Sequence, residues 1–191
     1  MLSLIIIISL KNITPKKKNP TRSINVRIVG IDPGLRHTGW GIIAQDGLHL
    51  RYIACGTISP KTSLPLPARL HHLHTSLSNV LEQYQPQTAA MEETFLNKNA
   101  MTSLLLGHAR GSLMLTLSLA GLPVEEYAAR VVKKTVVGTG RAEKEQISMM
   151  IRHLLPGAEI PTPDAADALA VAVCHALHTS TQARIHAKVT P

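Results

Sequence analysis

Aromatic residues are scarce in this sequence, since one Trp, one Phe and three Tyr make up only 3% of its 191 residues. The apolar 45% is therefore mostly aliphatic, and it is sufficient for the core of one domain. Cysteine is scarcer still, because Cys55 and Cys174 stand alone in apolar stretches. Two distant cysteines exclude a disulfide framework and favour reduced thiols in a cytoplasmic protein. The ten histidines lack the paired spacing of a zinc site.

Long apolar runs are also missing. The run from Leu2 to Leu10 is far shorter than the ~20 residues that span a bilayer, so no membrane association is expected. Its lysines follow the apolar stretch, whereas a signal peptide places them before it. We expect residues 1–24 to be a disordered basic leader. A weak membrane or organelle address is the alternative interpretation.

Acidic residues are few, with 12 Asp and Glu against 20 Lys and Arg, for a formal charge of +8. Six of the basic residues lie within residues 1–27, which contain no acid. The rest of the chain has 14 basic and 12 acidic residues, a net charge of only +2. The positive charge favours an anionic partner. The net charge of +2 outside residues 1–27 supports such a partner less strongly than the +8 of the whole chain does.

The hydrophobic pattern predicts strands and helices that form a mixed sheet flanked by helices, which is α/β in class. Asp46-Gly47 between the second and third strands indicates a hairpin. The expected strands are 26–31, 39–44, 48–58, 88–91 and 124–127. The expected helices are 65–84, 99–120, 129–137, 142–155 and 163–178. We expect residues 25–178 to form one domain, followed by a flexible polar tail over residues 179–191.

Four of the twelve acids occupy unusual positions. Asp32 ends the first predicted strand and Glu92 ends the fourth. Asp164 and Asp167 open the last predicted helix, three residues apart and therefore on one face. Because ligands gather at the carboxyl ends of the strands in α/β sheets, the four carboxylates are predicted to converge there. Oxygen ligands of this kind favour Mg²⁺, and two ions about 4 Å apart would suit the attack of water on a phosphodiester.

Each of these acids also has a plainer explanation when it is considered alone. Asp32-Pro-Gly is a common turn, Asp164 is a candidate helix cap, and Glu92 could be a solvated strand end. Asp167 favours the joint interpretation, because it is surrounded in the sequence by small apolar residues, where a surface acid is out of place.

Basic side chains gather between residues 130 and 152. The segment Gly138-Thr-Gly140 lacks the third glycine of a dinucleotide loop, and no Walker lysine is present, so we expect no nucleotide cofactor. Arg141 and Lys144 are predicted at a helix start, where backbone N–H groups also attract phosphate. We favour phosphate binding over an ordinary charged helix face for the group Arg130, Lys133, Lys134, Arg141, Lys144 and Arg152.

A series of motifs runs in order from Val26 to His178. It comprises Gly30-Ile-Asp-Pro-Gly34, Thr38-Gly-Trp-Gly41, Glu92-Glu-Thr-Phe95, Leu106-Gly-His-Ala-Arg-Gly111, Glu126-Tyr-Ala, Val136-Val-Gly-Thr-Gly-Arg-Ala-Glu-Lys144 and Asp164-Ala-Ala-Asp-Ala-Leu-Ala170. With these motifs the chain closely resembles the RuvC family of bacterial crossover junction endodeoxyribonucleases. The first motif alone is weak, since sugar kinases and actin-like ATPases open similarly. Two departures stand out: residues 1–24 have no family counterpart, and His108 replaces the more usual Gln.

The resemblance implies an RNase H-like mixed five-stranded sheet flanked by helices. It implies that Asp32, Glu92, Asp164 and Asp167 are the catalytic residues and the ligands of Mg²⁺, two ions per site, with Mn²⁺ as a substitute. Some family members carry His at the position of Asp164. The resemblance also suggests DNA contacts by Lys133 and Lys144, and base stacking by Phe95. We expect the nearby Lys134 and Arg141 to bind DNA as well. A buried core ring is the competing interpretation of Phe95, the only Phe.

The resemblance further implies a homodimer that resolves four-way (Holliday) DNA junctions by paired nicks in recombination and repair, with the RuvA–RuvB branch-migration complex as a partner. The predicted helix 99–120 supports a dimer, because its leucines cover most of its circumference and need a cover on more than one side. Leu105 and Leu113 are the candidates to face the second copy. Other helices of the same chain are the alternative cover.

Three other functions compete with junction cleavage. A nuclease of the RNase H-like type could act on another nucleic acid, such as RNA. A non-catalytic junction-binding protein would need a lost carboxylate, and all four are present. An actin-like ATP-binding protein would need a second phosphate loop and a longer chain.

Overall fold

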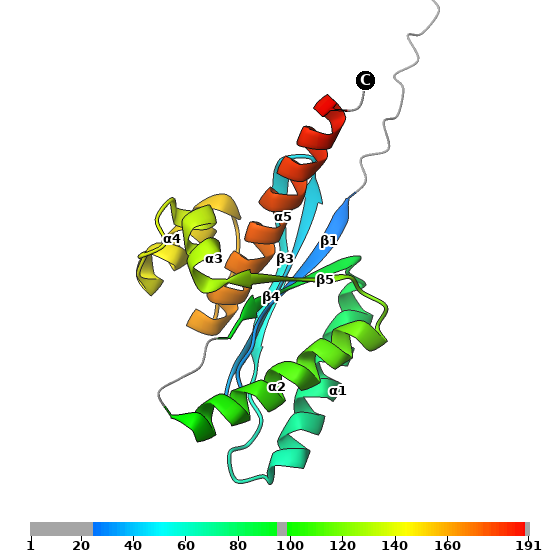
Figure 1. The fold of residues 1–191 in the computed structure, drawn as a ribbon, viewed down its shortest axis with the longest axis vertical. Coiled ribbons are helices and arrows are strands. Elements are labelled where there is room, and N and C mark those ends of the chain that lie inside the picture. Colours follow the sequence, from blue (N-terminus) through cyan, green and yellow to red (C-terminus); the bar gives the residue numbers. More distant parts are fainter. Residues whose placement is uncertain (1–24, 95–98, 190–191) are drawn as a thin grey trace, which may run out of the picture.

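The computed structural model describes residues 25–94 and 99–189, and side chains up to residue 181 (Figure 1). The predicted leader, residues 1–24, and Phe95 lie outside the described residues. The described strands are β1 (Val26–Asp32), β2 (Thr38–Asp46), β3 (His49–Ile58), β4 (Thr88–Glu93) and β5 (Val124–Ala128). The described helices are α1 (Leu66–Tyr84), α2 (Ala100–Leu119), α3 (Ala129–Val137), α4 (Lys144–Leu154) and α5 (Pro163–Val189). The predicted α/β class and element order are confirmed.

The five strands form one mixed sheet in the order β3-β2-β1-β4-β5. Strands β1, β2 and β3 pair in antiparallel fashion, and the predicted hairpin turns at Gly47, whose φ of 61° suits glycine. Strand β4 lies parallel to both β1 and β5. The carboxyl ends of β1, β4 and β5 therefore meet at the same edge of the sheet.

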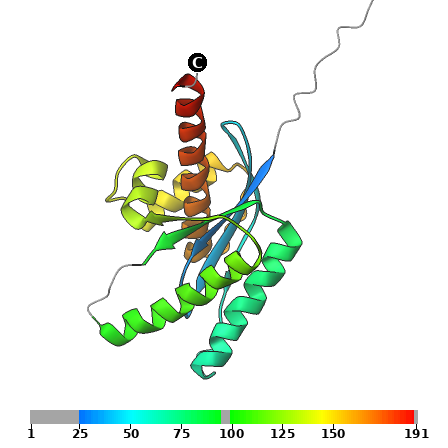
Figure 2. The same ribbon diagram turned by 45° about the vertical axis from the view of Figure 1, so that its right-hand side comes forward.

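Helices cover both faces of the sheet, as Figures 1 and 2 show. On one face, α1 and α2 enclose a core that includes Leu73, Leu113 and Met91. On the other, α3, α4 and α5 enclose a core that includes Ile147 and Leu169. This three-layer arrangement buries the aliphatic residues that the composition predicted. No helix in the described part of the chain has both the length and the apolar character to cross a membrane.

Helix α5 lies unusually close to the sheet because the strands beneath it carry glycines. A Cβ atom on Gly39 would collide with the carbonyl of Asp164, and one on Gly30 would collide with that of Ala168. Gly30 and Gly41 are directly paired between β1 and β2. The absence of side chains at these positions lets the start of α5 rest on the backbone of the strands.

Helix α5 is longer than predicted. It does not end at His178 but continues to Val189, because no glycine or proline occurs between Asp164 and Val189 to stop it. The Gln45 amide donates to the carbonyl of Ala176 at 2.9 Å, and the Ser180 hydroxyl donates to the carbonyl of Gly47 at 3.2 Å. Both contacts attach the helix to the β2–β3 hairpin, and the one from Ser180 lies beyond the predicted end. Flexibility of the last residues stays a prediction.

Helix α2 does not present the leucines that we expected to face a partner. Leu113 is fully buried in the core of its own chain, and Leu105 packs partly buried against that core. The prediction for Leu113 was wrong because its face of α2 lies against α1 and the sheet. The apolar side chains that stay exposed on α2 are instead Met101 (63%), Leu104 (56%), Leu115 (59%) and Leu119 (70%).

Candidate active site

The sheet places Asp32 and Glu92 next to each other. Ile31 and Met91 are partners in the parallel pairing of β1 with β4, and each acid directly follows one of them. Ile31 and Met91 both point into the core under α1 and α2. Because side chains alternate along a strand, Asp32 and Glu92 point to the opposite face, which α5 covers.

The first turn of α5 adds Asp164 and Asp167 to this edge. Thr162 caps the helix, since its hydroxyl accepts a hydrogen bond from Ala165 N at 3.2 Å, and it also bonds to the Thr57 hydroxyl of β3. The cap is therefore Thr162, which the sequence analysis missed, and the suggestion that Asp164 serves only as a cap fails. Asp164 and Asp167 lie near enough to Asp32 for their charges to raise its pKa, as described next.

The four carboxylates repel one another. Burial, and after it the charges of Glu92, Asp167 and Asp164, together raise the pKa of Asp32 to about 8. Burial and the charge of Asp167 raise the pKa of Glu92 to about 7. Burial also raises the pKa of Asp167, against the opposing effect of Lys144. Such crowding of acids in a partly dry site is typical of catalytic centres and of cation sites.

Two of the predicted basic residues lie beside the acids. Lys144, at the start of α4, places Nζ 3.5 Å from Asp167 Oδ2, and its side chain is 67% exposed. Its charge lowers the pKa of Asp32, Glu92 and Asp167, and Lys133 of α3 lowers that of Glu92 and Asp167. These ammonium groups only partly offset the negative charge.

The other two predicted DNA contacts, Lys134 and Arg141, are not among the charges that lower the pKa of the acids. Lys134 is exposed in the last turn of α3, and Arg141 is exposed in the loop before α4. The helix itself begins at Lys144 with Glu143 as its cap, and the Gln146 backbone N–H donates to the Glu143 carboxylate in a capping box. That N–H group is therefore not free for phosphate, which weakens the helix-start argument made for Arg141 and Lys144 while leaving their charges available.

The acids have the chemistry of a divalent-metal site without its final geometry. Carboxylate oxygens are the preferred ligands of hard cations, and a cation would relieve the repulsion between them. In the described residues, however, no three side chains of Asp, Glu, His or Cys are arranged so that they could hold a metal ion as they stand. The residue types therefore suit a divalent ion, and holding one would require the carboxylates to lie closer together.

Not every motif residue belongs to this centre. Arg110 of α2 forms an ion pair with Glu126 of β5, which ties the helix to the edge of the sheet. His108, the departure noted in the sequence, is exposed on α2. These residues have structural or surface positions rather than places among the carboxylates.

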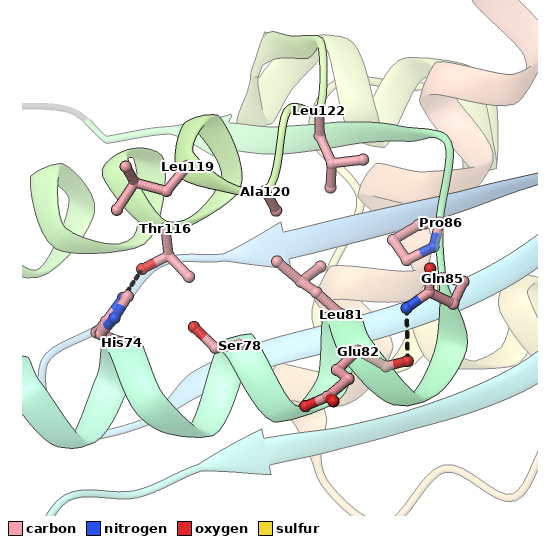
Figure 3. Close-up of a pocket in the computed structure, with 10 residues that line it drawn as sticks. All are labelled: His74, Ser78, Leu81, Glu82, Gln85, Pro86, Thr116, Leu119, Ala120 and Leu122. Atoms are coloured by element: carbon pink, nitrogen blue, oxygen red, sulfur yellow. Dashed lines mark hydrogen bonds between the residues drawn. The ribbon is translucent and has the colours of Figure 1, made fainter.

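A cavity of about 320 Å³ lies between α1 and α2, on the other face of the sheet from the acids (Figure 3). His74 and Thr116 are hydrogen-bonded across it at 2.9 Å, and Glu82 is its one acidic lining residue. It therefore lacks the grouped carboxylates of the candidate active site. A second cavity, of about 500 Å³, adjoins Asp164 and is lined by Arg36, His37 and Arg69, none of which the sequence analysis singled out.

The fold and the acidic edge together define a nuclease of the RNase H-like class, and comparison with known proteins specifies it. Residues 28–175 match the model of the family described as crossover junction endodeoxyribonuclease RuvC. The crossover junction endodeoxyribonuclease RuvC of Xanthobacter autotrophicus is 56% identical over 162 residues, which cover 85% of this chain and 96% of the relative. The chain belongs to the RuvC family of crossover junction endodeoxyribonucleases, whose members are metal-dependent.

Solved structures agree with this assignment. The structure of T. thermophilus RuvC in complex with a Holliday junction substrate is similar with a TM-score of 0.76 and 32% identity, over 82% of this chain and 96% of that one. The yeast mitochondrial Holliday junction resolvase Ydc2 has a TM-score of 0.63 at 13% identity, over 86% of this chain and 84% of that one. This second similarity supports the fold alone.

Proposed function

We propose that this protein is a Mg²⁺-dependent endonuclease that resolves four-way DNA junctions by paired, symmetric nicks in recombination and repair. The observation that carries the proposal is the gathering of Asp32, Glu92, Asp164 and Asp167 at one sheet edge. There the pKa values of Asp32, Glu92 and Asp167 are raised by burial and by the charges of neighbouring acids. Membership of the RuvC family, and the junction bound by the T. thermophilus relative, supply the substrate class.

The four carboxylates would hold two Mg²⁺ ions, with Mn²⁺ as a substitute. Such ions supply an activated water nucleophile and neutralise charge on the phosphate oxygens. The protein's own part is to place the acids on rigid elements, two on strands and two on a helix that rests on Gly39. Lys144, beside Asp167, is positioned to stabilise negative charge that develops on the phosphate during attack.

Junction binding would rest on the basic residues Lys133, Lys134, Arg141 and Lys144. Lys133 and Lys144 flank the carboxylates, so they would contact phosphates next to the cleaved bond. Lys134 and Arg141 would extend the contact along the strand. We propose base stacking for Phe95 from the family resemblance only, because this residue lies outside the described structure.

The enzyme would act as a homodimer, since a two-fold axis places two equivalent sites on the two strands that must be nicked. The exposed apolar side chains of α2, above all Leu104, Leu115 and Leu119, are candidates for the dimer contact. Gly107 and Gly111 leave open space beside them, which would let a second backbone approach. The cytoplasm is the proposed location, and the RuvA–RuvB complex the proposed partner during branch migration.

Cleavage of defined substrates tests the proposal. A labelled four-way junction, a linear duplex and an RNA–DNA hybrid are each incubated with the full-length protein, with and without Mg²⁺. We expect paired nicks in the junction alone, and only with the metal. Preferential cleavage of the hybrid would indicate the alternative nuclease activity, and binding of the junction without any cleavage would indicate a non-catalytic protein.

A further inference from the structure

The cavity beside Asp164 is built from four separate parts of the fold. Its walls come from the loop after β1, the start of α1, the first turns of α2 and the start of α5 (elements labelled in Figure 1). The residues that line it are Gly34, Leu35, Arg36, His37, Arg69, Thr102, Leu105, Leu106 and Asp164. Two arginines and a histidine therefore face one acid in a space of about 500 Å³ that touches the candidate active site.

Arg69 is held in a fixed position in this wall. Its Nη2 donates to the carbonyl of Leu35 at 3.1 Å, which attaches the guanidinium to the loop directly after Asp32. Its Nε is buried and has no hydrogen-bond partner in the described structure. An unpaired buried donor costs free energy, and a neutral side chain would hold the loop without that cost. A guanidinium that keeps an unpaired donor in the wall of a cavity is suited to an anion bound there.

The cations of the cavity lack acidic partners in the described part of the chain. Among the described residues, ion pairs join Arg110 to Glu126 and Lys144 to Asp167. Neither Arg36 nor Arg69 takes part in one. Arg36 is exposed at the rim. Guanidinium groups bind phosphate oxygens through two parallel hydrogen bonds, so this pair of arginines suits a phosphate.

The position of the cavity relative to the acids indicates which phosphate of the DNA it could bind. Lys133 and Lys144 approach the carboxylates from α3 and α4, whereas Arg36 and Arg69 lie on the side of α1 and α2. A DNA strand with its cleaved bond at the carboxylates would therefore meet cations on both sides. Leu105 and Leu106, the lining leucines that come from α2, offer an apolar surface to a sugar.

We propose that this cavity binds a phosphate next to the one that is cleaved, with Arg36 and Arg69 as its ligands. The inference rests on the proposed junction-cleaving function and adds a substrate-binding subsite to it. The scissile strand is thereby held between two groups of cations, the lysines of α3 and α4 and the arginines of the cavity. Two anchored phosphates fix the direction of the strand across the acids.

Charge-removing variants test the subsite. Arg36→Gln and Arg69→Gln are compared with the wild type and with Arg51→Gln, a matched control that removes an exposed arginine on β3. Binding of a fluorescent four-way junction is measured in Ca²⁺ over a range of salt concentrations. Each cavity variant should lose about tenfold in affinity, the value of one charged hydrogen-bonded contact. The slope of log affinity against log salt should fall by about 0.9, and the control should match the wild type.

A modified substrate identifies the phosphate itself. Junctions are made with one neutral methylphosphonate at each position on either side of the cleaved bond. At one position, the methylphosphonate junction should bind the wild type more weakly than the unmodified junction does. Arg36→Gln should bind these two junctions almost equally, because the variant has already lost its contact with that phosphate. If both cavity variants keep the wild-type salt slope and are weakened by every methylphosphonate as much as the wild type, the subsite does not exist.

Two further readouts separate the possible failures. Arg69→Gln also removes the hydrogen bond to Leu35, so its thermal unfolding is recorded, and Arg36→Gln, whose side chain is exposed, decides the matter if Arg69→Gln is unstable. The wild type is assayed for junction cleavage in Mg²⁺ in parallel. A wild type that does not cut junctions contradicts the proposed function, whereas normal cutting with unaffected variants contradicts only the subsite.

Discussion

The ammonium group of Lys144 lies 3.5 Å from a carboxylate oxygen of Asp167, and this pair joins the start of α4 to the first turn of α5. Lys144 is largely exposed while Asp167 is largely buried, with side-chain exposures of 67% and 18%. In the proposed function, the lysine would leave this pair when an ion occupies the acids and would contact a DNA phosphate. The contact links the acidic centre to the basic surface that the junction would cover.

Replacement of Asp32 by Asn should abolish cleavage and spare junction binding. Asn keeps the shape of the side chain and removes the charge that would hold the metal, at a cost of about 10³-fold or more in rate. Cleavage is measured in Mg²⁺ and binding by gel shift in Ca²⁺. Asp46→Asn, at the exposed end of β2, is the control and should cut normally. Persistent cutting by Asp32→Asn would contradict the metal site.

The same substitution should stabilise the metal-free protein. The pKa of Asp32 rises from 3.8 to about 8 on folding, so its contribution to stability is complete below pH 4 and is lost as the pH rises through 8. The wild type in EDTA should therefore be more stable at pH 5 than at pH 8, as Glu92, with a pKa raised to about 7, also requires.

Urea unfolding at both pH values provides the measurement. At pH 8, Asp32→Asn should exceed the wild type by about 2 kcal/mol in free energy of unfolding, a value reduced from the full linkage because the site is partly hydrated. Mg²⁺ should raise the stability of the wild type more than that of the variant. Equal stabilities in EDTA at pH 8 would show that neither burial nor the neighbouring acids destabilise the charged form of Asp32.

Alanine at Lys133 or Lys144 should weaken junction binding in a salt-dependent way. Each lost phosphate contact should lower the log–log salt slope by about 0.9. Lys61→Ala, which removes an exposed lysine in the loop before α1, is the matched control. Fluorescence titrations at several salt concentrations measure the slope. Unchanged slopes for both variants would make these lysines ordinary solvated residues, despite their effect on the pKa of Glu92.

A glutamate on the exposed face of α2 should dissociate the homodimer without unfolding the chain. Leu104 and Leu115 are 56% and 59% exposed, so Leu104→Glu or Leu115→Glu should give folded monomers that no longer make paired nicks. Leu113 is fully buried, so Leu113→Glu should unfold the domain instead. Leu48→Glu, on the β2–β3 hairpin, is an exposed control. Sedimentation and circular dichroism distinguish these results, and paired nicking by a monomer would refute the dimer.

The sequence alone determined the order and type of the elements, and it singled out the four acids of the candidate site. Strand and helix periodicities are local, and Asp46-Gly47 specifies its turn without help from the rest of the chain. Helix ends were less accurate, since α5 passes the predicted end at His178. Beyond that residue the helix also contacts the distant hairpin, through the bond from Ser180 to Gly47.

Only the tertiary structure decided how these acids meet and what surrounds them. Asp164 approaches Asp32 because Gly39 leaves room for the backbone of α5, a packing relation that no local pattern contains. The burial of Leu113 and the exposure of Leu115 depend on which side of α2 faces α1, and the leucines of that helix do not reveal it. Arg69 joins Asp164 in one cavity because four remote segments fold against each other. Periodicity specifies which residues form an element, whereas close packing selects the face that each element buries.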